Sequence, residues 1–156
     1  MLEGKEVTWF PSYGAEVRGG TANCTVVISD EMIGSPVVSA PEILIVMSDA
    51  SLDKFLPRLR GGGMLILDSS LVQPKALRHD IHAVEVPATE IASRLGKTKS
   101  ANMVLLGALV AETGFLKQDS AFNSIETVMP VAKRGMIAGN KKAILEGIHF
   151  IEDKKS

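Results

Sequence analysis

Residues 9–24 contain the side chains of this sequence that are best suited to chemistry. The segment, WFPSYGAEVRGGTANC, combines large aromatic side chains with one carboxylate, Glu16, and one guanidinium, Arg18, set among glycines. Glycine lets another backbone or a phosphate approach closely, and the planar guanidinium matches the oxygens of a carboxylate or a phosphate. A loop that contacts such a group is one interpretation. A turn between two strands, in which Glu16 and Arg18 are merely solvated, is the other.

Other candidate groups each lack a neighbour that their chemistry needs. Residues 58–63 (RLRGGG) follow a helical pattern and precede a strand. Phosphate-binding loops instead follow a strand and precede a helix, so a helix end and turn is favoured here. His79 and His82 flank Asp80 without a third ligand nearby, which favours solvated side chains over a metal site.

Cys24 and residues 68–70 are the remaining candidates. Cys24 begins a strand with no base close by, so a buried structural thiol is favoured over a nucleophile. Residues 68–70 (DSS) follow a buried strand, where a ligand contact and a helix cap or turn are both open. The sequence has no Gly-x-Ser-x-Gly, His-Glu-x-x-His or Gly-Lys-Ser/Thr motif, and therefore no complete catalytic set.

Length and composition exclude several classes of protein. The chain has 156 residues, 46% of them hydrophobic, which suits one ordinary domain, 1–156. Lys+Arg 17 against Asp+Glu 18 gives a net charge of -1, so no nucleic-acid partner is expected. The single cysteine excludes a disulfide framework and a self-contained iron–sulfur cluster, which needs about four thiolates. No signal peptide or membrane span is visible, so a cytoplasmic setting is expected.

Short β-branched runs alternate with helical patterns along the chain. Strands are expected at residues 7–10, 24–29, 43–47, 64–67 and 82–86. The continuous apolar run at 43–47 is typical of a central strand covered on both faces. Five helices are expected, at 49–60, 89–95 and 101–113 and at two later segments, with caps at Asp49, Ser100, Asp119 and Asn140.

This pattern predicts an α/β fold with three layers, in which helices flank a mostly parallel twisted sheet and the C-terminal half is helical. The segment 101–113 is apolar on nearly every side, so it should be buried between layers or at a subunit contact.

Residues 7–24 closely resemble the gamma subunit of 2-oxoacid:ferredoxin oxidoreductases. The likeness continues through residues 28–36 (ISDEMIGSP), 87–92 (PATEIA), 102–109 (NMVLLGAL) and 140–147 (NKKAILEG), and so covers essentially the whole chain. The residues of these segments are most similar to those of the 2-oxoglutarate type, and the pyruvate and branched-chain types are close relatives.

The resemblance implies a subunit of a thiamine-diphosphate-dependent enzyme that converts 2-oxoglutarate, coenzyme A and oxidised ferredoxin to succinyl-CoA, carbon dioxide and reduced ferredoxin. Thiamine diphosphate, magnesium and [4Fe–4S] clusters would belong to partner alpha, beta and ferredoxin-like delta subunits, and the isolated chain would be inactive, without catalytic or metal-binding residues. Its contribution would be to assembly and to the coenzyme A side of the site. The residues implied in coenzyme A binding or subunit contact are Tyr13, Gly14, Glu16, Arg18, Gly19, Gly20, Thr21 and Asn23.

Two departures from the family pattern affect these expectations. The family begins with a strand and a Gly-x-Gly-Gly-Gln-Gly-type turn, which is missing before Val7, so a homo-oligomer or a partner chain should cover the exposed apolar surface. Lys97-Thr98-Lys99 stands where relatives often carry an arginine, which argues against a bidentate anion clamp there. A stand-alone nucleotide- or acyl-binding module and a purely structural assembly subunit are the alternative functions.

Overall fold

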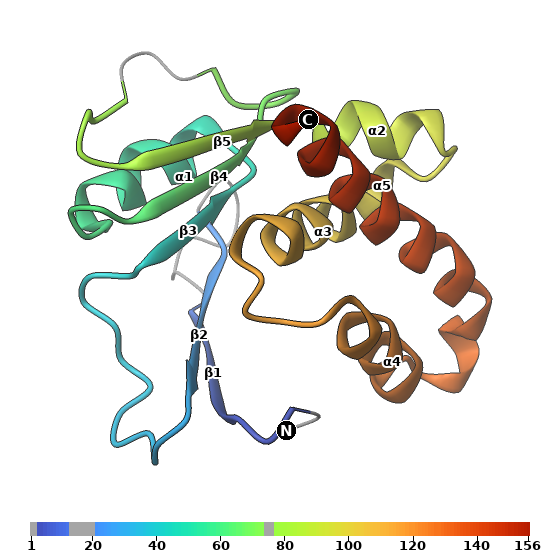
Figure 1. Ribbon diagram of the computed structural model, residues 1–156, viewed down its shortest axis with the longest axis horizontal. Coiled ribbons are helices and arrows are strands. Elements are labelled where there is room, and N and C mark those ends of the chain that lie inside the picture. Colours follow the sequence, from blue (N-terminus) through green and yellow to red (C-terminus); the bar gives the residue numbers. More distant parts are fainter. Residues whose placement is uncertain (1–2, 13–20, 74–76) are drawn as a thin grey trace.

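The computed structural model describes residues 3–12, 21–73 and 77–156, which form an N-terminal α/β half and a C-terminal helical half (Figure 1). Three short 3₁₀ helices, η1 (Leu56–Arg58), η2 (Thr98–Ser100) and η3 (Val131–Met136), connect the longer elements. The strands are β1 (Glu6–Ser12), β2 (Asn23–Ser29), β3 (Ile43–Val46), β4 (Met64–Asp68) and β5 (His82–Val86). The helices are α1 (Asp49–Phe55), α2 (Ala88–Arg94), α3 (Ala101–Thr113), α4 (Gln118–Val128) and α5 (Ile137–Lys155).

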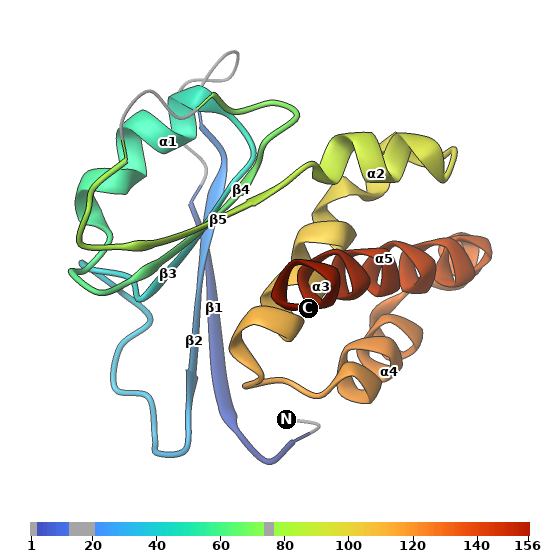
Figure 2. The same ribbon diagram turned by 45° about the horizontal axis from the view of Figure 1, so that its top comes forward.

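A parallel sheet with strand order β3-β4-β5 forms the middle layer. Helix α1 covers one face of this sheet, and α3 and α5 cover the other (Figure 2). Side chains of β4 alternate between the two cores: Leu65 and Leu67 pack in the cluster that includes Leu52 of α1, and Ile66 packs among residues of α2, α3 and α5. This alternation confirms the predicted three layers.

The position of the central strand was predicted incorrectly. The apolar run at 43–47 forms β3, which is an edge strand with Ile45 41% exposed, whereas β4 is central. Apolar character reports burial of a strand, but the crossover connections decide its place in the sheet. The order of strands is therefore not contained in the apolar run itself.

The first two strands form a separate antiparallel hairpin and do not join the parallel sheet. Pro11 lies inside β1, opposite Cys24, although the sequence predicted that the strand would stop there. Proline lacks an N–H donor, and an edge strand tolerates that loss. Both strands of a two-stranded sheet are edge strands, so β1 continues to Ser12.

Three of the predicted helix caps differ in the structure. Ser48, rather than Asp49, caps α1, and its hydroxyl accepts a bond from the Ser51 N–H at 3.3 Å. Asp119 lies in the first turn of α4, one residue inside the helix. Asn140 lies within α5, where it is buried and accepts a hydrogen bond from the Ser100 hydroxyl.

Ser100 does occupy the cap position of α3, but its side chain makes no capping bond. Its hydroxyl donates instead to the Asn140 side-chain oxygen at 3.1 Å. The two polar residues that the sequence assigned to separate helix starts therefore bond to each other.

Helices α3 and α5 cross with their backbones in direct contact, and Figure 2 shows α5 lying across α3. A Cβ added at Gly107 would lie 2.0 Å from the Ile144 carbonyl oxygen, and one added at Gly147 would lie 2.0 Å from the Val104 carbonyl oxygen. The crossing buries Val104, Leu105 and Ala108, so the apolar segment 101–113 is buried between layers as predicted. No helix in the described ranges is both long enough and apolar enough to cross a bilayer.

Replacing either crossing glycine should destabilise the fold. Gly107→Ala and Gly147→Ala each force a methyl group into a carbonyl, so the helices must separate, which should cost about 3 kcal/mol of the free energy of unfolding. Gly135→Ala is the matched control, because a Cβ there meets nothing within 4 Å. Urea unfolding followed by circular dichroism measures the change. Unfolding midpoints for Gly107→Ala and Gly147→Ala equal to that of the control would contradict this crossing geometry.

Candidate functional site

The predicted site segment lies in the sequence between β1 and β2, which form a hairpin. Ser12 and Asn23 are partners in the antiparallel register, so the intervening chain begins and ends at paired residues. Thr21 and Asn23 are half-buried. The other predicted site residues lie outside the described residues, and their roles stay predictions: Tyr13, Gly14, Glu16, Arg18, Gly19 and Gly20.

The returning arm of this segment is attached to α1. The Lys54 ammonium donates to the Thr21 hydroxyl oxygen at 2.9 Å and lies 5.5 Å from the centre of the Phe55 ring. Thr21, just before β2, therefore lies beside α1.

One face of the hairpin presents apolar side chains to the surroundings. In the β1–β2 register Val7 lies opposite Ile28, Trp9 opposite Val26 and Pro11 opposite Cys24, so these six side chains share one face. Trp9 is 61% exposed and Val26 52% exposed. We call this set the outer hairpin face. A contiguous exposed apolar surface of this kind marks an interaction site.

Cys24 belongs to this face and is exposed, so the prediction of a buried structural thiol was wrong. The prediction relied on how often free cysteines are buried. In β2, however, the inward side chains are Thr25 and Val27, which are half-buried, and the alternation places Cys24 on the outer side.

The outer hairpin face continues into a groove of about 380 Å³ between the hairpin and α4. Val7 and Ile28 line one side, and Phe115, Leu116 and Val128 line the other. Glu3 also lines the groove, and its carboxylate accepts a bond from the Lys117 N–H at 2.9 Å. A bond from Ser120 and this bond from Lys117 hold the pKa of Glu3 below its ordinary value.

The glycine-rich segment 58–63 is a structural turn, as the sequence predicted. Gly62 has a φ of 74°, and its N–H donates to the Asp80 carbonyl at 2.7 Å. Gly63 has no room for a side chain, since a Cβ would lie 2.8 Å from the Arg60 carbonyl oxygen. The N–H of Gly62 in this turn is therefore bonded within the protein, as in a structural turn.

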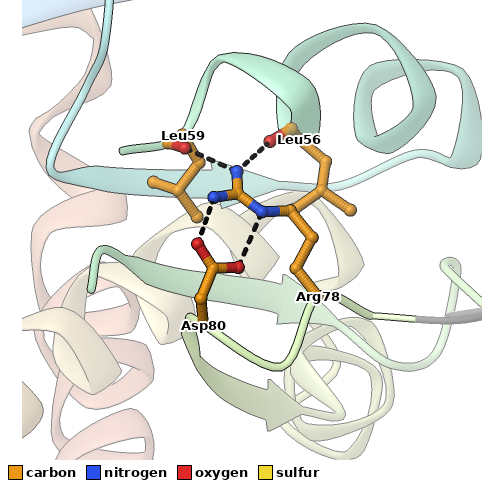
Figure 3. Close-up of polar contacts among 4 residues, drawn as sticks. All are labelled: Leu56, Leu59, Arg78 and Asp80. Carbon is orange, nitrogen blue, oxygen red and sulfur yellow. Dashed lines mark hydrogen bonds and ion pairs between the residues drawn. The ribbon is translucent and has the colours of Figure 1, made fainter. Parts of the chain in front are cut away.

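Arg78 fixes this turn from the other side (Figure 3). Its guanidinium donates to the Leu59 carbonyl at 2.6 Å, to the Leu56 carbonyl at 3.3 Å, and through two nitrogens to the Asp80 carboxylate at 2.9 and 2.5 Å. The hydrogen bond to Arg78 holds the pKa of the Asp80 carboxyl below its ordinary value. No pattern in the sequence marks Arg78 for this role, because its partners are carbonyls and a carboxylate that only the fold brings together.

The two histidines near Asp80 do not form a metal site. His82 Nε2 lies 2.9 Å from a Glu112 carboxylate oxygen, and the Lys155 ammonium lies 3.0 Å from the other oxygen. Asp80 bonds to Arg78 instead. The described residues contain no group of three side chains that could hold a metal ion.

Asp68 is fully buried and holds the start of α2. Its carboxylate accepts bonds from the Thr89 hydroxyl at 2.6 Å, from the Thr89 N–H at 3.2 Å and from the Ser70 N–H at 3.1 Å. The end of β4 is thereby joined to the first turn of α2. Residues 69 and 70 form a turn, which was one of the structures expected there, and the ligand contact stays a prediction.

Comparison with known proteins gives consistent matches. The family described as pyruvate ferredoxin/flavodoxin oxidoreductase matches residues 1–150. Subunit VorA of the ketoisovalerate oxidoreductase from Methanothermobacter thermautotrophicus is 41% identical over 70% of this chain and 22% of its own length. Subunit KorC of the 2-oxoglutarate synthase from the same organism is 38% identical over 94% of this chain and 83% of its own length. The chain thus spans about a fifth of the VorA relatives and most of KorC.

Solved structures share the fold. The gamma subunit of a keto/oxoacid ferredoxin oxidoreductase from Geobacter sulfurreducens has a TM-score of 0.78 and 28% identity, and the match covers 97% of this chain and 83% of that one. Subunit PORC of the pyruvate oxidoreductase from Thermotoga maritima has a TM-score of 0.68 and 27% identity over 95% of this chain and 81% of that one.

The contact of Glu112 with His82 and Lys155 should make stability depend on acid. Burial of the Glu112 carboxyl opposes its ionisation, but the bonds from His82 and Lys155 outweigh burial and hold its pKa below 4.5. A lowered pKa in the folded state stabilises the protein above the unfolded value, and this contribution is lost as the pH falls through the folded value. Below pH 4.5, we expect the free energy of unfolding of Glu112→Gln to depend less on pH than that of the parent protein. Chemical unfolding at a series of pH values tests this, with Glu146→Gln, which removes a carboxylate outside this contact, measured in parallel. Equal dependence on pH for Glu112→Gln and the parent protein would contradict the prediction.

Proposed function

The chain belongs to the pyruvate ferredoxin/flavodoxin oxidoreductase family as a subunit of the gamma type, and we propose that its outer hairpin face docks on the catalytic subunits of such an enzyme. The single observation behind this proposal is the apolar outer hairpin face, with Trp9 61% exposed at its centre. Aromatic side chains in the middle of an apolar patch dominate the binding energy of protein interfaces.

The VorA relatives support this assignment of the surface. The matched segment makes up 22% of VorA, so in that protein the same sequence pattern is part of a much longer polypeptide. A domain within a longer chain commonly packs against the remainder of that chain through an apolar surface. We propose that the outer hairpin face makes the equivalent contact here, with alpha and beta subunits that hold thiamine diphosphate and magnesium.

The reaction that we propose is the oxidative decarboxylation of 2-oxoglutarate, with coenzyme A and ferredoxin, in the cytoplasm. The KorC relatives of 2-oxoglutarate synthase from two Methanothermobacter species support this substrate because they align over 94% of this chain, whereas the VorA match covers 70% of it. The described residues do not fit a resident cluster or metal, since they offer one cysteine and no group of three possible ligands. Under the proposal the [4Fe–4S] clusters belong to a ferredoxin-like delta subunit.

Within the complex, we assign residues 13–23 to the coenzyme A side of the active site. The segment leaves the hairpin at Ser12 and returns at Asn23, so it extends from the same element that carries the outer hairpin face. Arg18 provides a planar fork for a phosphate, and glycines at 14, 19 and 20 permit close approach. A subunit that docks through the hairpin would bring this segment to the partner's site.

Trp9→Glu should weaken assembly of the complex. A charge at the centre of an apolar interface leaves an unpaired buried group, and the loss should exceed about tenfold in affinity. Val131→Glu is the matched control, because Val131 is 77% exposed but lies on η3, away from the hairpin. Reconstitution with the partner subunits, followed by size-exclusion chromatography, measures the change. Equal assembly of both variants, or an isolated chain that alone reduces a dye with 2-oxoglutarate, would refute the proposal.

Arg18→Ala tests the coenzyme A assignment separately. Losing one charge-assisted contact costs about 1.5 to 3 kcal/mol, so the apparent KM for coenzyme A should rise roughly ten- to hundredfold in the assembled complex. Decarboxylation without coenzyme A should persist. An intact complex with unchanged dependence on coenzyme A would exclude the ligand role, and a complex that no longer forms would make Arg18 an interface residue.

A further inference from the structure

A second pocket, distant in sequence from the hairpin, lies between the α2–α3 connection and the start of α5. Its volume is about 380 Å³, and it is lined by Lys97, Thr98, Lys99, Met136 and Asn140, together with Gly96 and Ser100. None of its described lining residues belongs to the outer hairpin face. The proposed function leaves this pocket without a role.

Asn140 offers this pocket a hydrogen-bond donor. The residue is only 5% exposed, and its side-chain oxygen accepts the bond from Ser100. Its amide nitrogen bonds to no group in the described part of the chain. Every fully buried side-chain nitrogen or oxygen in that part of the chain has a hydrogen-bond partner, so this amide nitrogen is not fully buried. The amide nitrogen therefore remains accessible, and the pocket that Asn140 lines is the space available to it.

The two chain segments that form the pocket carry positive charge alone. Residues 94–101 contain three cationic side chains and no carboxylate, and residues 131–142 contain four and no carboxylate. The whole chain, in contrast, has a net charge of -1. Only Lys141 among these cations has an ion-pair partner in the described residues, Glu126 at 2.5 Å. The surroundings of the pocket therefore favour an anion.

Lys97 is held at the pocket by the end of α2. Gly96 has a φ of 68°, and the Lys97 N–H donates to the Ala92 carbonyl at 2.9 Å, which closes the helix with a Schellman motif. The Lys97 side chain lies over Gly139 of α5, where an added Cβ would be 2.4 Å from Lys97 Cε and 2.8 Å from Nζ. Contact with a bare backbone limits the positions of a long side chain, and so places its ammonium beside the pocket.

We propose that this pocket binds a phosphate group. Asn140 would donate a hydrogen bond to the anion, and Lys97 and Lys99 would neutralise its charge. Lysine is a common phosphate ligand that acts as a point charge with rotatable donors, whereas arginine binds a phosphate or a carboxylate through two parallel bonds. The lysines at 97 and 99 therefore replace a bidentate contact with point charges and do not abolish the site. The inference does not depend on the proposed function, since it concerns different residues.

The experiment uses the full chain labelled with ¹⁵N and titrated with inorganic phosphate at constant ionic strength. Saturable shifts should appear in the Asn140 side-chain amide and in the N–H groups of residues 97–99. Lys99→Gln should weaken binding about three- to fivefold, as expected for an exposed charge. Asn140→Asp places a carboxylate in the pocket, keeps an acceptor for Ser100, and should weaken binding about tenfold or more.

Lys142→Gln is the control, because Lys142 is an exposed lysine of α5 that does not line the pocket. It should bind phosphate as the parent protein does. A parallel titration with AMP identifies the source of the phosphate: tighter binding than inorganic phosphate indicates a phosphate ester, and equal binding indicates the free anion. The proposal is overturned if sodium chloride gives the same shifts, or if Lys142→Gln weakens binding as much as Lys99→Gln. Because Lys99 is exposed, this comparison holds even if Asn140→Asp fails to fold.

Discussion

The contact on which the helical half depends is the one between the backbones of α3 and α5. Gly107 lies against the Ile144 carbonyl and Gly147 against the Val104 carbonyl, with no space for a side chain at either point. Reciprocal contacts of this kind fix both the position of each helix along its axis and its rotation about that axis. The buried residues of the sheet, α2 and α4 then pack against a pair of helices whose relative position is already set.

Both ends of α5 are placed by this crossing. At the first end, Asn140 meets Ser100, and the pocket beside them forms where α5 passes the α2–α3 connection. At the other end, Lys155 meets Glu112, and Lys154 donates to the Glu85 carbonyl of β5 at 3.0 Å. In the described part of the chain, the buried clusters that join the sheet and the helices contain no residue of β1 or β2, and the outer hairpin face is apolar and exposed. The molecule thus combines a closely packed helical half with an exposed apolar hairpin that is suited to contact with a partner.

The sequence predicted the layers well because each depends on local periodicity. The helix at 101–113 and the strands later found as β4 and β5 follow directly from their apolar patterns. Strand order, the outer hairpin face and the Asn140–Ser100 bond depend on contacts between distant segments, which periodicity does not encode. The apolar pattern that followed Asn140 predicted a helix capped there, but α5 begins three residues earlier, at Ile137. Arg78 was missed for a related reason, since Leu56 and Leu59 contribute carbonyls and not side chains.

The central claim is that the outer hairpin face is covered when the chain joins its complex. Amide hydrogen exchange, compared between the isolated chain and the assembled enzyme, measures this directly. Covering the hairpin should slow exchange throughout β1 and β2, because opening of a two-stranded sheet would then require dissociation of the partner. Exchange in η3, on the opposite part of the chain, should stay unchanged. Unchanged exchange in β1 and β2, with protection elsewhere, would contradict the account.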